Sequence, residues 1–273
     1  MNSSDIDTEA LISRILESRK YRSSGLNQDT IRDLILQEAP QYQSSKKLLK
    51  SVKRKLHNIV APYLGEPDYE ILTAKLEQIN KPSPSSPEIK SFCEAVLAEH
   101  ASTQERLPYM EDFYIQLFQR TGIPNAVLDL ACGLHPLAFP WMGLPLSVQY
   151  HAYDIIQPRV DFINDFLRTI GLAPLAENRD ILVHPPKIKA DLGLIFKEAH
   201  RMEKRQPGCS RQLWADLNVE TLAVSLPTQN LSGTHSLLEQ HRALIHNNLP
   251  KAHVVEEILI ENEVIFLIRK TQG

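Results

Sequence analysis

The feature that most constrains the fold of this chain is a change of hydrophobic periodicity near Asn125. Before this residue, apolar positions recur at the three- and four-residue spacing of amphipathic helices, as in ALISRILESRKY, QDTIRDLILQEA and DYEILTAKLEQI. After it, short apolar runs rich in β-branched residues alternate with helical segments. The runs are AVLDLA, VQYHAYDI, PLAENRDIL, ADLGLIFK and ETLAVSLP. Strands that alternate with helices predict an open α/β sheet of parallel strands joined by crossover helices.

The two ends of the chain add further parts to this sheet. The C-terminal stretch HVVEEILIENEVIFLIRK holds two apolar runs around a polar Glu261-Asn262 pair, which predicts a β-hairpin. On the N-terminal side, the proline- and serine-rich stretch NKPSPSSPEIK marks a connection between helices. We therefore expect an N-terminal all-helical domain over residues 1–98 and an α/β domain over residues 99–273.

Composition narrows the class of protein. No apolar run reaches the roughly 18 residues that span a bilayer, and MNSSDIDTEALISRI lacks the basic and apolar regions of a signal peptide. The three cysteines are far apart and show no CxxC spacing, which argues against disulfides and against a structural zinc site. We expect a cytoplasmic protein without a metal ion.

Positive charge is concentrated in the segment QYQSSKKLLKSVKRKLHNIV, residues 41–60, which contains no acid. Its cations are Lys46, Lys47, Lys50, Lys53, Arg54 and Lys55. Helical spacing places residues 46, 50, 53, 54 and 57 on one face and apolar residues on another. Two interpretations remain open: a solvated helix face, or a surface for a polyanion. Because aromatic residues are sparse here, docking on the backbone of folded nucleic acid fits better than stacking on single strands.

Three acids follow the predicted strands: Asp129 in VLDLACG, Asp154 in HAYDII and Asp180 in NRDILV. In open α/β sheets, ligands bind beyond the carboxyl ends of the strands. The first turn contains only Gly133, so it can approach a ligand closely but makes a poor pyrophosphate cradle. A nucleoside without phosphates fits better, and S-adenosylmethionine is the common one. The alternative is that these aspartates only cap the loops after the strands.

Two long segments, EHASTQERLPYMEDFY and LDLACGLHPLAFPWMGLP, resemble the aminoglycoside-resistance 16S rRNA (guanine-N7) methyltransferases. The resemblance extends along the whole chain, including SRKYR, KRKLHNIVAPYL and LIFK. It implies a class I (Rossmann-like) S-adenosylmethionine-dependent methyltransferase core with an N-terminal helical domain that docks on rRNA. It also implies a monomeric enzyme that modifies the decoding-site helix of 16S rRNA in the assembled 30S subunit and confers aminoglycoside resistance.

The resemblance carries roles onto individual residues. It predicts that Arg106 binds the carboxylate of the cofactor, Asp154 the ribose hydroxyls and Asp180 the adenine amino group. The cofactor-binding set is His100, Ser102, Arg106, Ala131, Gly133, Asp154, Ile155, Asp180, Ile181 and Lys197. The rRNA-binding set is Lys46, Lys50, Lys53, Arg54, Lys55 and Arg201. For Arg106, a buried pairing with a protein acid is the alternative, and for Arg201 a plain surface charge.

Guanine N7 carries a lone pair and no proton, so methyl transfer requires no general base and we assign no catalytic residue. Positioning by Lys197 and Gln229 is the most we expect. The chain departs from the family pattern in SLPTQNLSGTHSLLEQHR, where Gln229 replaces a cation, and in His135, where asparagine is usual. The alternatives are therefore a homologue with weak, relaxed or shifted specificity, such as a neighbouring adenine N1, or a cofactor- or ribosome-binding protein with little activity.

Overall fold

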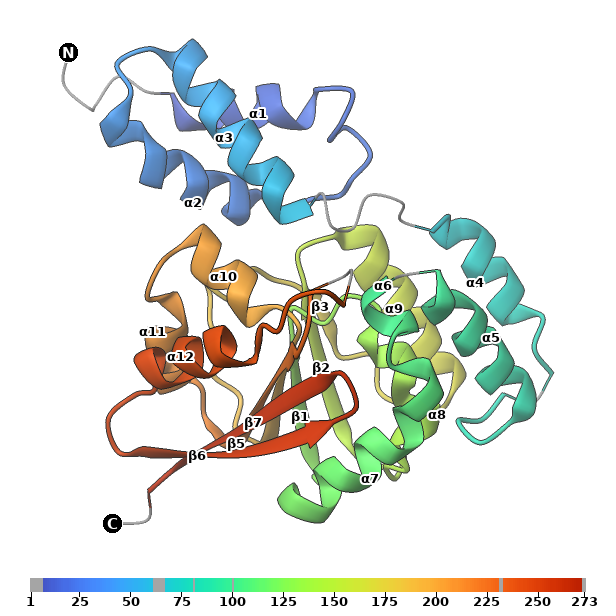
Figure 1. Ribbon diagram of the computed structural model, residues 1–273. Helices are drawn as coiled ribbons and strands as arrows, with labels where there is room; N and C mark the ends of the chain where they lie inside the picture. The colour runs from blue at the N-terminus through green and yellow to red at the C-terminus, as the bar shows by residue number, and fades with distance from the viewer. Residues whose placement is uncertain (1–6, 61–66, 81, 100, 231–232, 272–273) are drawn as a thin grey trace.

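The computed structural model describes residues 7–60, 67–80, 82–99, 101–230 and 233–271, without the side chains of residues 101 and 102. Its centre is a seven-stranded sheet in the order β3-β2-β1-β4-β5-β7-β6 (Figure 1). The strands are β1 Ala126–Leu130, β2 Gln149–Asp154, β3 Ala176–Asn178, β4 Ala190–Phe196, β5 Val219–Pro227, β6 His253–Ile260 and β7 Glu263–Lys270.

Strands β1 to β5 are parallel, whereas β7 is antiparallel to β5 and forms a hairpin with β6. The predicted open α/β sheet and the C-terminal hairpin are thus confirmed. Strand β1 lies between β2 and β4, so the direction in which strands are added reverses beside it. Ligands of open α/β sheets bind at such a reversal.

Helices cover both faces of the sheet, and three further helices lie beyond the carboxyl ends of its parallel strands. They are α1 Thr8–Leu16, α2 Gln28–Glu38, α3 Ser45–Val60, α4 Tyr69–Glu77, α5 Pro87–Ala98, α6 Ala101–Gln104, α7 Met110–Thr121, α8 Phe139–Met142, α9 Gln157–Thr169, α10 Ala199–Arg205, α11 Cys209–Asp216 and α12 Leu238–Asn248. One apolar core joins α4, α5, α7 and α9 to the sheet, and a second joins α10, α11 and α12 to its other face. No helix in the described part of the chain has the length and apolar character needed to cross a membrane.

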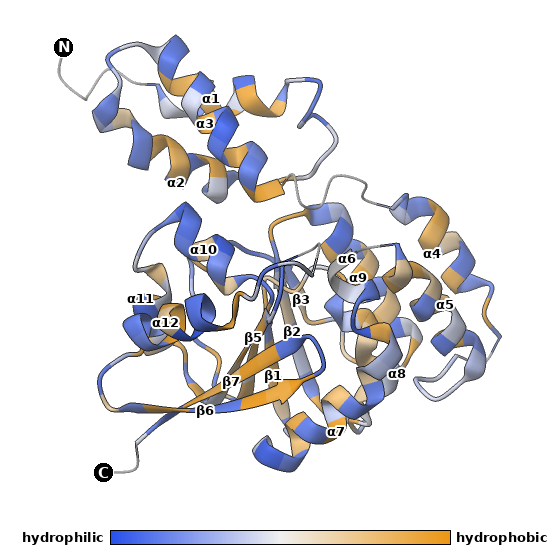
Figure 2. Cartoon of the chain, in the orientation of Figure 1, coloured by the Kyte–Doolittle hydropathy of each residue, from blue (hydrophilic) through white to orange (hydrophobic). Residues whose placement is uncertain are grey.

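Helices α1, α2 and α3 form a separate three-helix unit, seen at the top of Figure 1. Leu48, Val52 and Leu56 of α3 are buried in a core that these helices share and that meets the sheet domain at Ile156. Hydrophilic residues alternate with apolar ones along α2 and α3, whereas β7 is apolar along most of its length (Figure 2). The unit therefore has its own small core, as an amphipathic helix bundle requires.

The cores do not separate at residue 98. Leu72 and Leu76 of α4 and Cys93 and Leu97 of α5 belong to the same apolar cluster as the strands β1 and β2. Burial against the sheet thus ties these two helices to the α/β part of the molecule. A boundary drawn from the apolar cores falls between α3 and α4, and the division at residue 98 stays a prediction.

Candidate functional site

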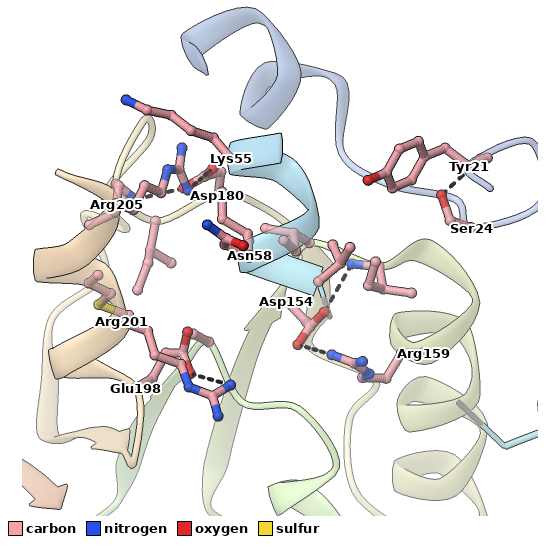
Figure 3. A pocket seen from close by; sticks show the side chains of 18 of the residues that line it. Tyr21, Ser24, Lys55, Asn58, Asp154, Arg159, Asp180, Glu198, Arg201 and Arg205 are labelled. Carbon is pink, nitrogen blue, oxygen red and sulfur yellow. Dashed lines mark hydrogen bonds and ion pairs between the residues drawn. The ribbon is translucent and has the colours of Figure 1, made fainter. Parts of the chain in front are cut away.

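Two cavities adjoin at the carboxyl ends of the parallel strands. The larger, of about 1140 Å³, lies between the three-helix unit and the ends of β1, β2 and β3 (Figure 3). The smaller, of about 50 Å³, lies beside the turn after β1. Ala131 and Arg159 line both, so the two spaces are neighbours. The larger cavity contains Asp154, Ile155, Asp180 and Ile181, and the smaller contains Arg106, Gly133 and Lys197, so seven predicted cofactor residues join Ala131 in lining this region.

The turn after β1 brings its backbone to the wall of the small cavity. Ala131 and Gly133 both have a φ of 54°, in the left-handed region that favours glycine. A Cβ atom added to Gly133 would meet no atom within 4 Å, so the space beside it is open. The small residues of the Ala-Cys-Gly sequence therefore leave backbone accessible where a ligand can approach closely.

Asp154 ends β2 and is only 5% exposed. Its Oδ2 accepts hydrogen bonds from the Gly133 amide at 3.0 Å and from Arg159 Nη1 at 2.7 Å, while its Oδ1 accepts from the Ile156 amide at 2.9 Å. The carboxylate thus fixes the turn after β1 relative to the end of β2. Sequence reasoning missed Arg159, although its position in the first turn of α9, shortly after Asp154 in the sequence, was the available signal.

Asp180 follows β3 and is 2% exposed. Its Oδ2 accepts from Thr30 Oγ1 at 2.7 Å and forms an ion pair with Arg205 Nη1 at 2.6 Å, and its Oδ1 accepts from the Leu182 amide at 3.0 Å. Figure 3 shows Arg205 reaching Asp180 from α10. Thr30 and Arg205 come from distant parts of the chain, so no local pattern could have predicted either contact.

Arg106 is buried beside the small cavity in an ion pair with Glu263. Its Nε and Nη2 donate to Glu263 Oε1 and Oε2 at 2.8 and 2.6 Å, and the rings of Phe113 and Phe196 lie 4.1 and 4.7 Å from the guanidinium carbon. Burial alone would raise the pKa of the Glu263 carboxyl, but Arg106 and Lys197 outweigh it and hold the pKa at about 2. The structure therefore contains the alternative given above for Arg106, a buried pairing with a protein acid. The binding of the cofactor carboxylate by Arg106 stays a prediction.

Lys197, which follows β4, completes this charged group. Its Nζ lies 2.8 Å from Glu105 Oε2 and 3.4 Å from Glu263 Oε1. The group thus places two cations at the wall of the small cavity, and two acids pair with them. Glu263 was not predicted from the sequence, where it reads only as the start of the second hairpin strand.

Asp129 does not border either of the two cavities, contrary to the expectation that it faces a ligand. It is 1% exposed and lies 2.7 Å from His135 Nδ1 and from the hydroxyl of Tyr150, which donates to it. The reason is its place inside β1 rather than after it: the strand continues through Leu130. The departure from the family pattern at His135 thus supplies a partner for a buried acid.

The predicted rRNA-binding residues fall into three groups. Lys46 and Lys50 are exposed on the amino-terminal half of α3, and Lys53 is half-buried. Arg54 on α3 and Arg201 on α10 line the larger cavity. Lys55 also lines it, but its Nζ forms a 2.6 Å ion pair with the buried carboxylate of Glu38.

Lys55 belongs to the predicted rRNA-binding set, but it does not share the exposed face that carries Lys50. Lys55 lies half a turn away, on the side of α3 that packs against α2.

Gln229 borders neither of the two cavities. His100 lies outside the described residues, as does the side chain of Ser102. Within the described ranges, no group of three or more metal-ligating side chains could hold a metal ion.

Three features define the class I S-adenosylmethionine-dependent methyltransferases: this strand order with β7 antiparallel to β5, the open turn after β1, and the acid at the end of β2. Residues 17–266 match the FmrO family of ribosomal RNA methyltransferases. The chain belongs to this family.

Individual relatives agree with this assignment. A 16S rRNA (guanine(1405)-N(7))-methyltransferase of Serratia marcescens is 32% identical over 261 residues, which cover 95% of this chain and 97% of the relative. The solved structure of the 16S rRNA methylase RmtB has a TM-score of 0.80 and 29% identity, covering 97% of this chain and 99% of its own. The 16S rRNA methyltransferase RmtF, solved in complex with S-adenosyl-L-homocysteine, has a TM-score of 0.81 and 26% identity over 98% of this chain and 99% of its own.

Proposed function

We propose that this protein transfers a methyl group from S-adenosylmethionine to N7 of a guanine in 16S rRNA. The substrate is the decoding-site helix in the assembled 30S subunit, and the enzyme acts as a cytoplasmic monomer that confers aminoglycoside resistance. The observation that carries the proposal is the pair of adjoining cavities at the turn after β1, lined by the residues that the family resemblance assigns to the cofactor.

The two cavities fit the parts of this cofactor. Asp154 would hold the ribose, and Asp180 and Ile181 would frame the adenine in the larger cavity. Arg106 and Lys197 would hold the amino-acid part beside the small cavity, against the open backbone at Gly133. When bound, S-adenosylmethionine supplies a methyl group on a positively charged sulfur. An amino-acid carboxylate beside two cations and a ribose diol beside a carboxylate are favourable, charge-assisted pairings.

The chemistry that remains for the protein is placement. Guanine N7 attacks with its own lone pair, so no side chain has to remove a proton, and rate depends on holding the base in line at close range. The target base must also leave its helix to reach the cavity. Arg54, Arg201 and Lys204 line the opening between the three-helix unit and the sheet, where they can contact the phosphates of an extruded nucleotide.

The test is methylation of purified 30S subunits, with N7-methylguanine mapped by borohydride and aniline cleavage followed by primer extension. Asp154→Asn should weaken binding of S-adenosylhomocysteine in calorimetry by roughly 10- to 100-fold, because a charge-assisted pair is lost. Asp161→Asn, on the exposed side of helix α9, is the control for the same change of charge and should bind like the wild type. A wild-type protein that binds no S-adenosylhomocysteine, or that leaves 30S guanines unmodified, would refute the proposal.

The altered segment after β5 favours a second outcome of the same experiment. Gln229 stands where relatives carry a cation, so the position of the flipped nucleotide can differ. Methylation at a neighbouring adenine N1 instead of guanine N7 would assign shifted specificity, and it would appear as apramycin resistance rather than resistance to kanamycin and gentamicin alone.

A further inference from the structure

The three-helix unit is joined to the strand ends that form the cofactor pocket. The Asn27 amide donates to the Ile155 carbonyl at 2.8 Å, and the Gln157 amide donates to the Gly25 carbonyl at 2.9 Å. Gly25 has a φ of 57°, and a Cβ atom there would lie 2.4 Å from Pro158 Cδ. Only glycine permits this approach. The start of α2 is thus fixed by backbone contacts directly after Asp154.

From this fixed start, α2 directs Thr30 at Asp180. Thr30 is fully buried, and its hydroxyl donates to Asp180 Oδ2 at 2.7 Å. Arg205 of α10 binds the same oxygen at 2.6 Å and also binds Asp33, one turn further along α2, at 2.8 Å. Asp180 is therefore held by two elements, α2 and α10, which Arg205 also joins to each other.

A carboxylate that is 2% exposed needs such partners. A buried carboxylate without donors either takes up a proton or moves toward water, because its charged form is poorly solvated. The segment that carries Asp180 belongs to neither a helix nor a long strand, since β3 ends at Asn178. Thr30 and Arg205 both bind Oδ2, and Oδ1 can accept a further donor besides the Leu182 amide.

We propose that Thr30 is a positioning residue of the cofactor site: together with Arg205 it holds Asp180, so that the three-helix unit completes the pocket for the adenosine part of the cofactor. This inference rests on the proposed function for the identity of the cofactor. It goes beyond that function by making a helix of the rRNA-docking unit part of the machinery that binds a nucleoside.

The test is calorimetry on the full chain with two probes, S-adenosylhomocysteine and 5′-methylthioadenosine, which lacks the amino-acid part. Thr30→Val keeps the shape of the side chain and removes the hydroxyl, so it should weaken both probes equally, by roughly 5- to 20-fold. Thr30→Ser retains the hydroxyl and should restore affinity to within about twofold of the wild type. Thr73→Val, the same substitution on α4 away from both cavities, is the matched control and should change neither affinity.

A double-mutant cycle separates positioning from a general loss of structure. If Thr30 acts through Asp180, then Thr30→Val should add nothing to the weakening caused by Asp180→Asn. Should Thr30→Val fail to fold, Arg205→Met tests the same carboxylate from α10 and should show the same equal loss for both probes. Wild-type affinity in Thr30→Val or in Arg205→Met, or additive losses in the cycle, would overturn the inference. A wild type that binds neither probe would instead overturn the proposed function.

Discussion

The buried ion pair of Arg106 and Glu263 makes one part of the stability of the protein depend on pH. Burial opposes the charge on Glu263, but Arg106 and Lys197 hold its pKa at about 2, below its ordinary value of 4.5. A carboxyl group with a lowered pKa contributes stability above its ordinary pKa, and this contribution disappears as the pH falls toward the folded value. The free energy of unfolding should therefore lose the Glu263 contribution between about pH 4.5 and pH 2.

We predict that Glu263→Gln removes this part of the pH dependence. At pH 7 the variant should be less stable by about 3 to 5 kcal/mol, because Arg106 is left buried without its counter-ion. Urea unfolding at pH 7 and at pH 3 measures both effects: the difference between variant and wild type should shrink at the lower pH. Glu239→Gln, an exposed glutamate on α12, is the control and should follow the wild type at both values. An undiminished difference at pH 3 would contradict the assignment of this titration to Glu263.

The elements of the sheet were predictable because they depend on local pattern. Runs such as AVLDLA and ADLGLIFK became β1 and β4, and the polar Glu261-Asn262 pair became the turn of the β6–β7 hairpin. PLAENRDIL predicted a longer strand than the three residues of β3. The observed strand ends at Asn178, where its pairing with β2 stops. Periodicity could not show that α4 and α5 pack on the sheet, because the choice of partner for an apolar helix face is a tertiary effect.

The site shows the same contrast between residues that local pattern predicts and contacts that tertiary packing decides. Asp154 and Gly133 were predictable from strand ends and turn chemistry, and Ala131 from the family resemblance, and all three line the cavities. The ion pair of Lys55 was not predictable, because helical spacing alone does not show that Glu38 of the preceding helix supplies a buried partner. Thr30 and Glu263 reach their partners in the site across more than 100 residues of sequence, and Arg205 reaches Asp180 from another element, α10. Such contacts are decided by packing, which no short motif records.

The loop after β5 holds the longer of the two departures from the family pattern given above, and contacts between its described residues close it on itself. The Leu237 amide donates to the Thr228 carbonyl at 2.8 Å, and Gln229 pairs with Ser236. Asn230 Oδ1 accepts from the Thr234 amide at 2.9 Å. A loop held in this way presents Gln229 at a fixed place beyond the carboxyl end of β5.

We predict that Gln229→Lys raises the single-turnover rate of 30S methylation by roughly 10-fold, which corresponds to one added phosphate contact in the transition state. Affinity for S-adenosylhomocysteine should not change, since Gln229 borders neither of the two cavities. Gln240→Lys adds the same charge on the exposed side of α12 and should leave the rate at the wild-type value. An equal rate in Gln229→Lys and Gln240→Lys would show that this position does not contact the nucleotide.

At the scale of the whole molecule, the three-helix unit has two separate surfaces. Its inner side meets the larger cavity through α2 and through the carboxyl end of α3, where Asn58 lies between Asp180 and Asp154 in Figure 3. Its outer side carries Lys46, Lys47 and Lys50, which are exposed and do not line the larger cavity. We therefore expect that substitutions on the outer side can disturb the proposed docking on rRNA without changing the proposed binding of the cofactor.

We predict that Lys46→Glu with Lys50→Glu abolishes association with 30S subunits at physiological salt and leaves the affinity for S-adenosylhomocysteine unchanged. Each phosphate contact that a lysine makes releases counterions, so replacing one of these two lysines by glutamine should lower the slope of log affinity against log salt by about 1. Cosedimentation with 30S subunits over a salt series measures both effects. Lys187→Glu with Lys251→Glu, two exposed lysines outside the unit, applies the same change of charge as a control. If the control pair weakens association as much as the α3 pair, net charge rather than a docking surface governs binding; if the α3 pair still cosediments, this face of α3 is only solvated.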